Sequence, residues 1–156
     1  MSGQKGEPTA SMLFTGYHGT VETFDRFQCP AYFADNYQTA AFFAERKIGN
    51  PTIMVCRLEF RDPYIVDLEG QSWGGFFLKD EKIWDACVEY LSAGDAEEEA
   101  YFRESGITIN FLSDYAESLG YDGVIALNCY EEDESCSTQY VVFDPDNIVI
   151  RKSYRG

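Results

Sequence analysis

The chain has 156 residues, a length that predicts one domain. Hydrophobic residues make up 45% of the sequence, enough to build a core, so intrinsic disorder of the whole chain is excluded. Twelve basic residues against 27 acidic ones give a net charge of −15. That charge argues against general binding to nucleic acids or anionic membranes but leaves room for one local basic pocket.

The first residues and the cysteines indicate the compartment. Residues 1–11 are small and polar and predict a flexible tail, followed by a single domain over residues 12–156. We find no pattern of a signal or transit peptide and no apolar run near the roughly 18 residues of a transmembrane helix, so we expect a cytoplasmic protein. The five cysteines include no Cys-x-x-Cys pair, which predicts reduced thiols and no metal site. Cys129 and Cys136 flank a loop that a disulfide could close, but we do not expect that bond.

Hydrophobic periodicity predicts a chain that begins with strands, inserts helices and ends with strands. Residues 12–18 form an apolar run that predicts a buried strand, and Gly19 and Thr20 after it predict a turn. Asn36 offers the N-cap of a first helix. The other strands are predicted over residues 31–34, 52–60, 64–67, 122–127, 138–143 and 147–151. The helices are predicted over residues 37–47, 80–91 and 109–119.

Three segments are predicted to lie between these elements. Residues 70–75 form a glycine-rich loop, residues 95–99 an acidic run on a solvated helix face or loop, and residues 128–137 an acidic loop. The order of elements predicts an α+β fold, in which helices pack on a mixed sheet. The sequence assigns no role to residues 70–106.

Three places hold residues that could form a binding site. His18, the only histidine, either caps a turn or offers a titratable hydrogen-bonding group beside a pocket, where Gly19 would let a ligand approach the backbone. Tyr32 and Phe33 are either one inward and one outward residue of a strand or a platform for a planar ring. Gln139 is either the solvent edge of a strand or a hydrogen-bonding group in a cleft. Alternation places it on one face with Val141 and Phe143, and Tyr140 and Val142 on the other.

The order and spacing of these places resemble the ADP-ribosyltransferase superfamily, in the branch whose signature is His, then Tyr, then Glu, Asp or Gln. Residues 17–20 (YHGT) resemble the first motif, and residues 31–35 (AYFAD) resemble the second as it stands in poly(ADP-ribose) polymerases. Residues 139–143 (QYVVF) resemble the third, with Gln139 in the place of the catalytic acid. The segments YDGVI, at 121–125, and YVVFDP, at 140–145, make small bacteriophage and polyvalent-protein members the most similar pattern.

This resemblance implies a fold of split mixed or antiparallel sheets with flanking helices, and NAD bound as a substrate in the cleft between two small sheets. His18 would bond the adenosine ribose, and the Gly19 backbone would hold the nicotinamide amide with Thr20 nearby. Tyr32, followed by Phe33, would stack on the nicotinamide. Phe43, eleven residues after Tyr32, would form the opposite wall.

Gln139 decides what chemistry the resemblance implies. An amide can bond the ribose, but it cannot act as a general base. Three outcomes stay open: the acceptor needs no base, a loop carboxylate substitutes, or the chain binds NAD without transferring ADP-ribose. The loop carboxylates are Glu131, Glu132 and Glu134.

The function expected from this pattern is mono-ADP-ribosylation of a protein with a basic surface, by a bacteriophage or mobile-element effector that acts on a host protein and counters host defence. An NAD glycohydrolase, with water as acceptor, is the second enzyme hypothesis. The alternatives of another class are a catalytically weak or inactive acidic inhibitor that covers a basic partner surface, and a structural module of a virion.

Overall fold

The computed structural model describes residues 11–131 and 136–155. Most of the expected tail, residues 1–10, lies outside the described residues, as do Glu132 and Glu134. The strands are β1 (Met12–Thr20), β2 (Ala31–Ala34), β3 (Thr52–Phe60), β4 (Tyr64–Asp67), β5 (Gly123–Tyr130), β6 (Cys136–Val142) and β7 (Ile148–Arg155). The helices are α1 (Tyr37–Glu45), α2 (Glu81–Ser92), α3 (Ala96–Ser105) and α4 (Ile109–Ser118), with a 3₁₀ turn, η1, at Pro145–Asn147.

The strands form one mixed sheet in the order β4-β5-β6-β2-β1-β3-β7. Only β4 and β5 run parallel, and the other neighbours are antiparallel. This sheet with its four helices confirms the α+β class. The expected division into two separate sheets is replaced by one seven-stranded sheet, whose halves β4-β5-β6-β2 and β1-β3-β7 are joined through the single residue pair Tyr17 and Ala34.

Side-chain caps set where the helices begin. The Asn36 side chain accepts a hydrogen bond from the Thr39 backbone N–H at 2.8 Å, which confirms the predicted N-cap. Asp80 caps α2 and Thr108 caps α4 in the same way. Asp95 caps α3, so the acidic run at 95–99 is the exposed first turn of a helix, where negative charge complements the helix dipole.

Two local predictions were wrong. Gly19 and Thr20 are not a turn, because β1 continues through them and pairs Gly19 with Ile53 and Thr20 with Thr52 of β3. The acidic loop predicted at 128–137 is shorter, because β5 extends to Tyr130 and β6 begins at Cys136. Asn128, with φ of 53°, lies at the register shift that lets this hairpin extend.

The core lies on both faces of the sheet, and β6 belongs to both sides. Val141 packs into the cluster beneath α2, α3 and α4, whereas Tyr140 and Val142 pack into the cluster with Phe33, between β2, β3 and β5. Phe143 packs against the Val141 side, so the alternation predicted for this strand is confirmed. The cluster with Phe33 also contains residues of β3, so it joins the two halves of the sheet by packing.

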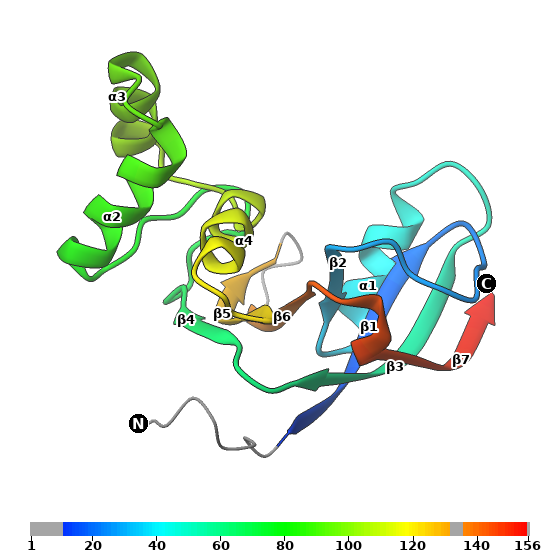
Figure 1. Ribbon diagram of the computed structural model, residues 1–156. Helices are drawn as coiled ribbons and strands as arrows, with labels where there is room; N and C mark the ends of the chain where they lie inside the picture. The colour runs from blue at the N-terminus through cyan, green and yellow to red at the C-terminus, as the bar shows by residue number, and fades with distance from the viewer. Residues whose placement is uncertain (1–10, 132–135, 156) are drawn as a thin grey trace.

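The helices divide between the two halves of the sheet, as Figure 1 shows. α1 packs on β1 and β3, and α4 packs on β5. α2 and α3 contact each other, α2 reaches α4, and the pair extends away from the sheet at the upper left of the view. None of the helices among the described residues has the length and apolar character needed to cross a membrane.

Candidate functional site

A pocket of about 310 Å³ opens between β1 and β2, the two strands that join the halves of the sheet. β2 is paired with β1 only at Tyr17, so the two strands diverge beyond it, toward His18 and Gly19. The side chains of α1, α4 and the loop at 70–75 close the other sides. The divergence of two strands in one sheet therefore creates the pocket.

Most of the predicted site residues come together here, although they lie far apart in the sequence. His18, Gly19, Tyr32, Phe33, Phe43 and Gln139 all line the pocket. Thr20 does not, because it is buried and its hydroxyl accepts a hydrogen bond from the Glu22 backbone N–H at 3.2 Å. Phe33 is 1% exposed and packs in the core behind His18, so Tyr32 alone presents a ring face from this pair.

The backbone of β2 fixes the orientation and tautomer of His18. Its Nδ1 lies 2.8 Å from the carbonyl oxygen of Tyr32, and because a carbonyl only accepts, Nδ1 carries the proton. Phe24, Phe27 and Phe33 surround the ring. Burial, and to a smaller extent the charge of Lys47, lower the pKa of His18 below its ordinary value. His18 is therefore a neutral imidazole whose Nε2 lone pair can accept a hydrogen bond.

Gly19 is required by the packing of α1. A Cβ atom at this position would lie 2.0 Å from the carbonyl oxygen of Ala40 and 2.9 Å from the backbone nitrogen of Ala44. The absence of a side chain lets α1 lie directly on β1, which carries Phe43 to the pocket. Lys47, just after α1, donates from Nζ to the Gly19 carbonyl oxygen at 3.1 Å and adds a positive charge to the pocket wall.

Three aromatic side chains from separate elements form the walls: Tyr32 of β2, Phe43 of α1 and Trp73 of the 70–75 loop. The rings of Phe43 and Trp73 meet edge to face with centroids 5.9 Å apart. Burial, followed by the charge of Asp114, raises the pKa of Tyr32, so its hydroxyl stays protonated near neutral pH. These walls suit a planar ring, which aromatic faces hold by stacking.

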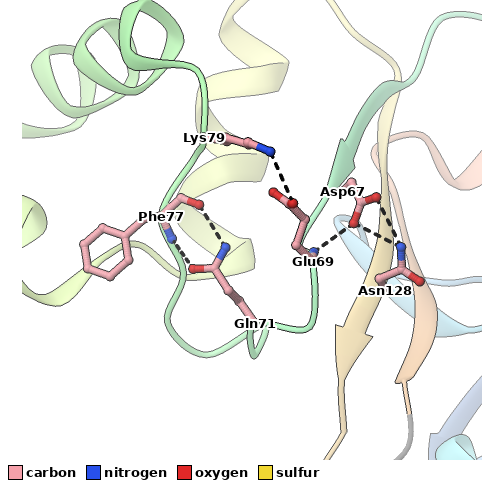
Figure 2. Close-up of polar contacts among 6 residues, drawn as sticks. All are labelled: Asp67, Glu69, Gln71, Phe77, Lys79 and Asn128. Carbon is pink, nitrogen blue, oxygen red and sulfur yellow. Dashed lines mark hydrogen bonds and ion pairs between the residues drawn. The ribbon is translucent and has the colours of Figure 1, made fainter.

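The glycine-rich loop that carries Trp73 is held by polar contacts at its base (Figure 2). The Gln71 side chain accepts from the Phe77 backbone N–H at 2.9 Å and donates to the Phe77 carbonyl oxygen at 3.0 Å. Asn128 donates to both carboxylate oxygens of Asp67, and the Gly70 N–H donates to the Asn128 carbonyl oxygen. Backbone contacts join Trp73 to the start of α4, where its carbonyl oxygen accepts from the Ile109 N–H.

Gln139 is bound to a buried carboxylate that the pocket does not contact. Its Nε2 donates to Oε2 of Glu131 at 3.0 Å, and the Ser137 hydroxyl donates to the same oxygen at 2.5 Å. Glu131 is 2% exposed and Gln139 is 6% exposed. Because Glu131 takes an amide proton, the Gln139 amide is fixed with its carbonyl oxygen free to act as an acceptor.

A second chamber of about 330 Å³ adjoins the first and shares His18 and Tyr32 with it. Phe24, Phe27 and Pro30 provide its apolar wall. Arg26, also in this wall, is paired with Asp146 at 3.0 Å. Each chamber has the size of a small-molecule site.

The sequence reasoning missed the residues that reach the pocket through loops or a helix end: Lys47, Trp73, Ile109 and Asn110. The motif GQSWGG, which places a tryptophan among glycines, was the one signal in the sequence for Trp73. Within the described residues, no group of three or more His, Cys, Asp or Glu side chains is arranged to hold a metal ion.

No family model, curated protein or solved structure matches this chain.

Proposed function

We propose that the chain is an NAD-dependent mono-ADP-ribosyltransferase that modifies a protein. The observation that carries the proposal is the meeting of three separate segments, at His18, Tyr32 and Gln139, around one pocket with aromatic walls. These are the segments on which the resemblance rests, and the folded chain brings them within one small volume.

The double chamber supports NAD as the substrate. NAD joins two ring-bearing halves through a diphosphate, and the site offers two adjoining spaces that share His18 and Tyr32. The chamber with Tyr32, Phe43 and Trp73 suits the nicotinamide, and the one with Phe24 and Phe27 suits the adenine. Lys47 contributes a positive charge for the diphosphate.

In this proposal the reaction breaks the bond between nicotinamide and C1′ of the ribose and joins C1′ to a nucleophile of the target, which releases its proton to the solvent. Positive charge grows on the ribose as nicotinamide leaves with the bonding electrons. The Gln139 carbonyl oxygen accepts from a hydroxyl of this ribose and orients the sugar, and the Nε2 lone pair of neutral His18 accepts from a hydroxyl of the adenosine ribose. The aromatic walls exclude water that would compete with the target.

Glu131 acts here as a positioning residue. Of the three loop carboxylates considered as substitutes for a catalytic acid, it is the one that the structure describes, and it does not line the pocket. Its bond to Nε2 prevents the Gln139 amide from turning its donor end toward the ribose.

The test is transfer of label from NAD to protein in a bacterial lysate, read on a denaturing gel. We expect a discrete labelled band with the native chain and its loss with His18→Ala or Tyr32→Ala. Tyr101→Ala is the matched control, because Tyr101 is 62% exposed on α3 and does not contact the pocket. Unchanged labelling in both pocket variants would overturn the site assignment.

The same experiment separates the alternatives. Release of nicotinamide without labelled protein would point to a glycohydrolase that uses water as acceptor. Failure to bind NAD in calorimetry would retire both enzyme hypotheses and favour the acidic inhibitor, whose binding would depend strongly on salt. Charge reversal of the acidic residues at 95–99, on the exposed start of α3, would weaken such an inhibitor and leave a transferase unaffected.

A further inference from the structure

A larger hollow of about 720 Å³ lies on the outer face of the sheet, across β1, β3 and β7. It ends at Tyr37, the first residue of α1, and shares only Tyr17 with the pocket at His18. We call it the β7 groove, after the edge strand that supplies its basic residues. It crosses three strands on an open sheet face, so its shape suits an extended chain.

The β7 groove gathers positive charge in a strongly acidic protein. Arg57, Arg151 and Lys152 line it, and no acidic side chain does. None of the three forms an ion pair with any residue that the structure describes, although the chain contains 27 acidic residues. Three unneutralised cations on one face favour an anionic ligand from outside the chain.

A β-bulge explains how two neighbouring residues of β7 both reach the groove. Successive side chains of a regular strand point to opposite faces. Here Val55 pairs with Lys152 and Cys56 with Ile150, so Arg151 is the extra residue of the bulge. The bulge turns Arg151 toward the same groove as Lys152, and such irregularities often re-aim a side chain at a functional site.

Aromatic rings lie among these cations. Tyr37 and Tyr154 are 47% and 44% exposed, and their rings meet edge to face with centroids 6.0 Å apart. The rings of Tyr17 and Tyr37 also meet edge to face, with centroids 6.5 Å apart. Lys152 reaches over Tyr154, with its Nζ 5.8 Å from the ring centroid. The groove therefore holds partly exposed rings together with positive charges.

We propose that the β7 groove binds a single strand of nucleic acid. Phosphates would lie against Arg57, Arg151 and Lys152, and bases would stack on the exposed faces of Tyr37 and Tyr154. An acidic peptide would use the charges but not the rings. The net charge of −15 opposes nucleic acid elsewhere on the surface, so binding is confined to this groove. This site is independent of the proposed reaction.

The test is fluorescence anisotropy with a labelled single-stranded 12-mer, as DNA and as RNA, in 50 mM salt. Arg57→Gln/Arg151→Gln/Lys152→Gln removes the three groove cations. Its matched control, Arg61→Gln/Lys79→Gln/Lys82→Gln, removes three exposed cations that do not line the groove, so both variants have the same net charge. We expect the groove variant to bind the strand at least about tenfold more weakly than the control does. The slope of its log K against log salt should also be less steep than that of the control, by about 2.

Tyr154→Leu keeps apolar bulk and removes the ring, and we expect it to weaken strand binding about tenfold. Thermal unfolding followed by circular dichroism shows whether each variant is folded. Any of these results would overturn the proposal: equal binding by the groove variant and its control, equal affinity for duplex, displacement by a poly-glutamate peptide as effective as by the strand, or no binding at 50 mM salt. A free mononucleotide that binds as tightly as the 12-mer would also overturn it in favour of a nucleotide site.

Discussion

At the scale of single residues, His18 is held by one hydrogen bond and by burial. The bond from Nδ1 to the Tyr32 carbonyl sets its tautomer, and the aromatic rings around it remove water. Burial disfavours the imidazolium ion, so the folded chain binds a proton at this site less readily than the unfolded chain does.

We predict that His18 titrates below 6.5, its ordinary pKa. As the only histidine, it gives one Cε1–H resonance, whose shift can be followed by proton NMR across pH 4.5–8. Because the folded pKa is lowered, the contribution of His18 to the free energy of unfolding is fully present above pH 6.5 and is lost as the pH falls through the folded pKa.

His18→Asn is the control, because its amide can still donate to the Tyr32 carbonyl and does not titrate. The difference in unfolding free energy between the native chain and this variant isolates His18 from the many carboxylates. As the pH falls below 6.5, we expect the native chain to lose more unfolding free energy than the His18→Asn variant does. A midpoint at or above 6.5 would contradict the burial of His18.

The hydrogen bond between Gln139 and Glu131 can be tested by exchanging the amide and the carboxylate between the two positions. Gln139→Glu alone places two carboxylates together and removes the donor to Glu131, so we expect it to lower the free energy of unfolding by about 1–3 kcal/mol at pH 7.5. The double variant Glu131→Gln/Gln139→Glu restores an amide–carboxylate bond with the charge next to the pocket. We expect it to recover the stability.

The swap also has a catalytic readout that rests on the proposed function. A carboxylate at position 139 could act as a general base, which contributes about 10²–10⁴-fold in typical enzymes, so the double variant should transfer ADP-ribose at least tenfold faster than the native chain. A double-mutant cycle in urea measures the coupling between the two positions. Additive losses of stability would contradict the bond, whatever the activity.

At the scale of elements, the strands and helices with clear periodicity could be predicted. The strands at 31–34, 52–60 and 64–67 begin and end where they were predicted, and each predicted helix is present with its cap. The errors fall where a tertiary contact overrides a local signal. Gly19 reads as a turn residue, but it is a strand residue because α1 needs the space of its missing side chain.

Some residues of the segments that carry the resemblance have a structural role: they stabilise turns and close packing. Asp122, in the YDGVI segment, accepts from the Arg61 and Asp62 backbone N–H groups and so fixes the turn between β3 and β4. Gly123 beside it has no room for a Cβ, which would lie 2.4 Å from the Phe60 ring. Asp144, in YVVFDP, caps η1. These motif residues predict backbone geometry, whereas the proposed transfer of ADP-ribose rests on His18, Tyr32 and Gln139.

The remaining parts of the candidate site could not be predicted because loops place them. Trp73 reaches the pocket through the Gln71–Phe77 contacts and the backbone bond to Ile109, and neither leaves a periodic signal in the sequence. The sequence assigned Glu131 to an acidic loop. It is buried because the hairpin of β5 and β6 is longer than the hydrophobic pattern indicates.

At the scale of the whole molecule, the question is whether the two halves of the sheet unfold together. They share one β1–β2 pair, but the core cluster with Phe33 contains side chains of β3 and of β6, and so of both halves. Cys87 and Cys129 lie in the cluster beneath α2, α3 and α4, and Cys56 lies in the other. All three are 0% exposed, and burial raises the pKa of each thiol to about 12.

We predict that a thiol reagent at pH 8 labels the exposed Cys136 fastest and the half-buried Cys29 more slowly, and labels the other three only through unfolding. Mass spectrometry after trypsin digestion assigns each site. Because the core cluster with Phe33 joins the halves, the protection of Cys56, Cys87 and Cys129 should fall with urea along the same slope, equal to that of global unfolding. A shallower slope for Cys87 alone would mean that α2 and α3 open on their own, since a smaller surface is then exposed. The helix pair α2 and α3 would then move without disturbing the pocket, and the loop that carries Trp73 would stay in place.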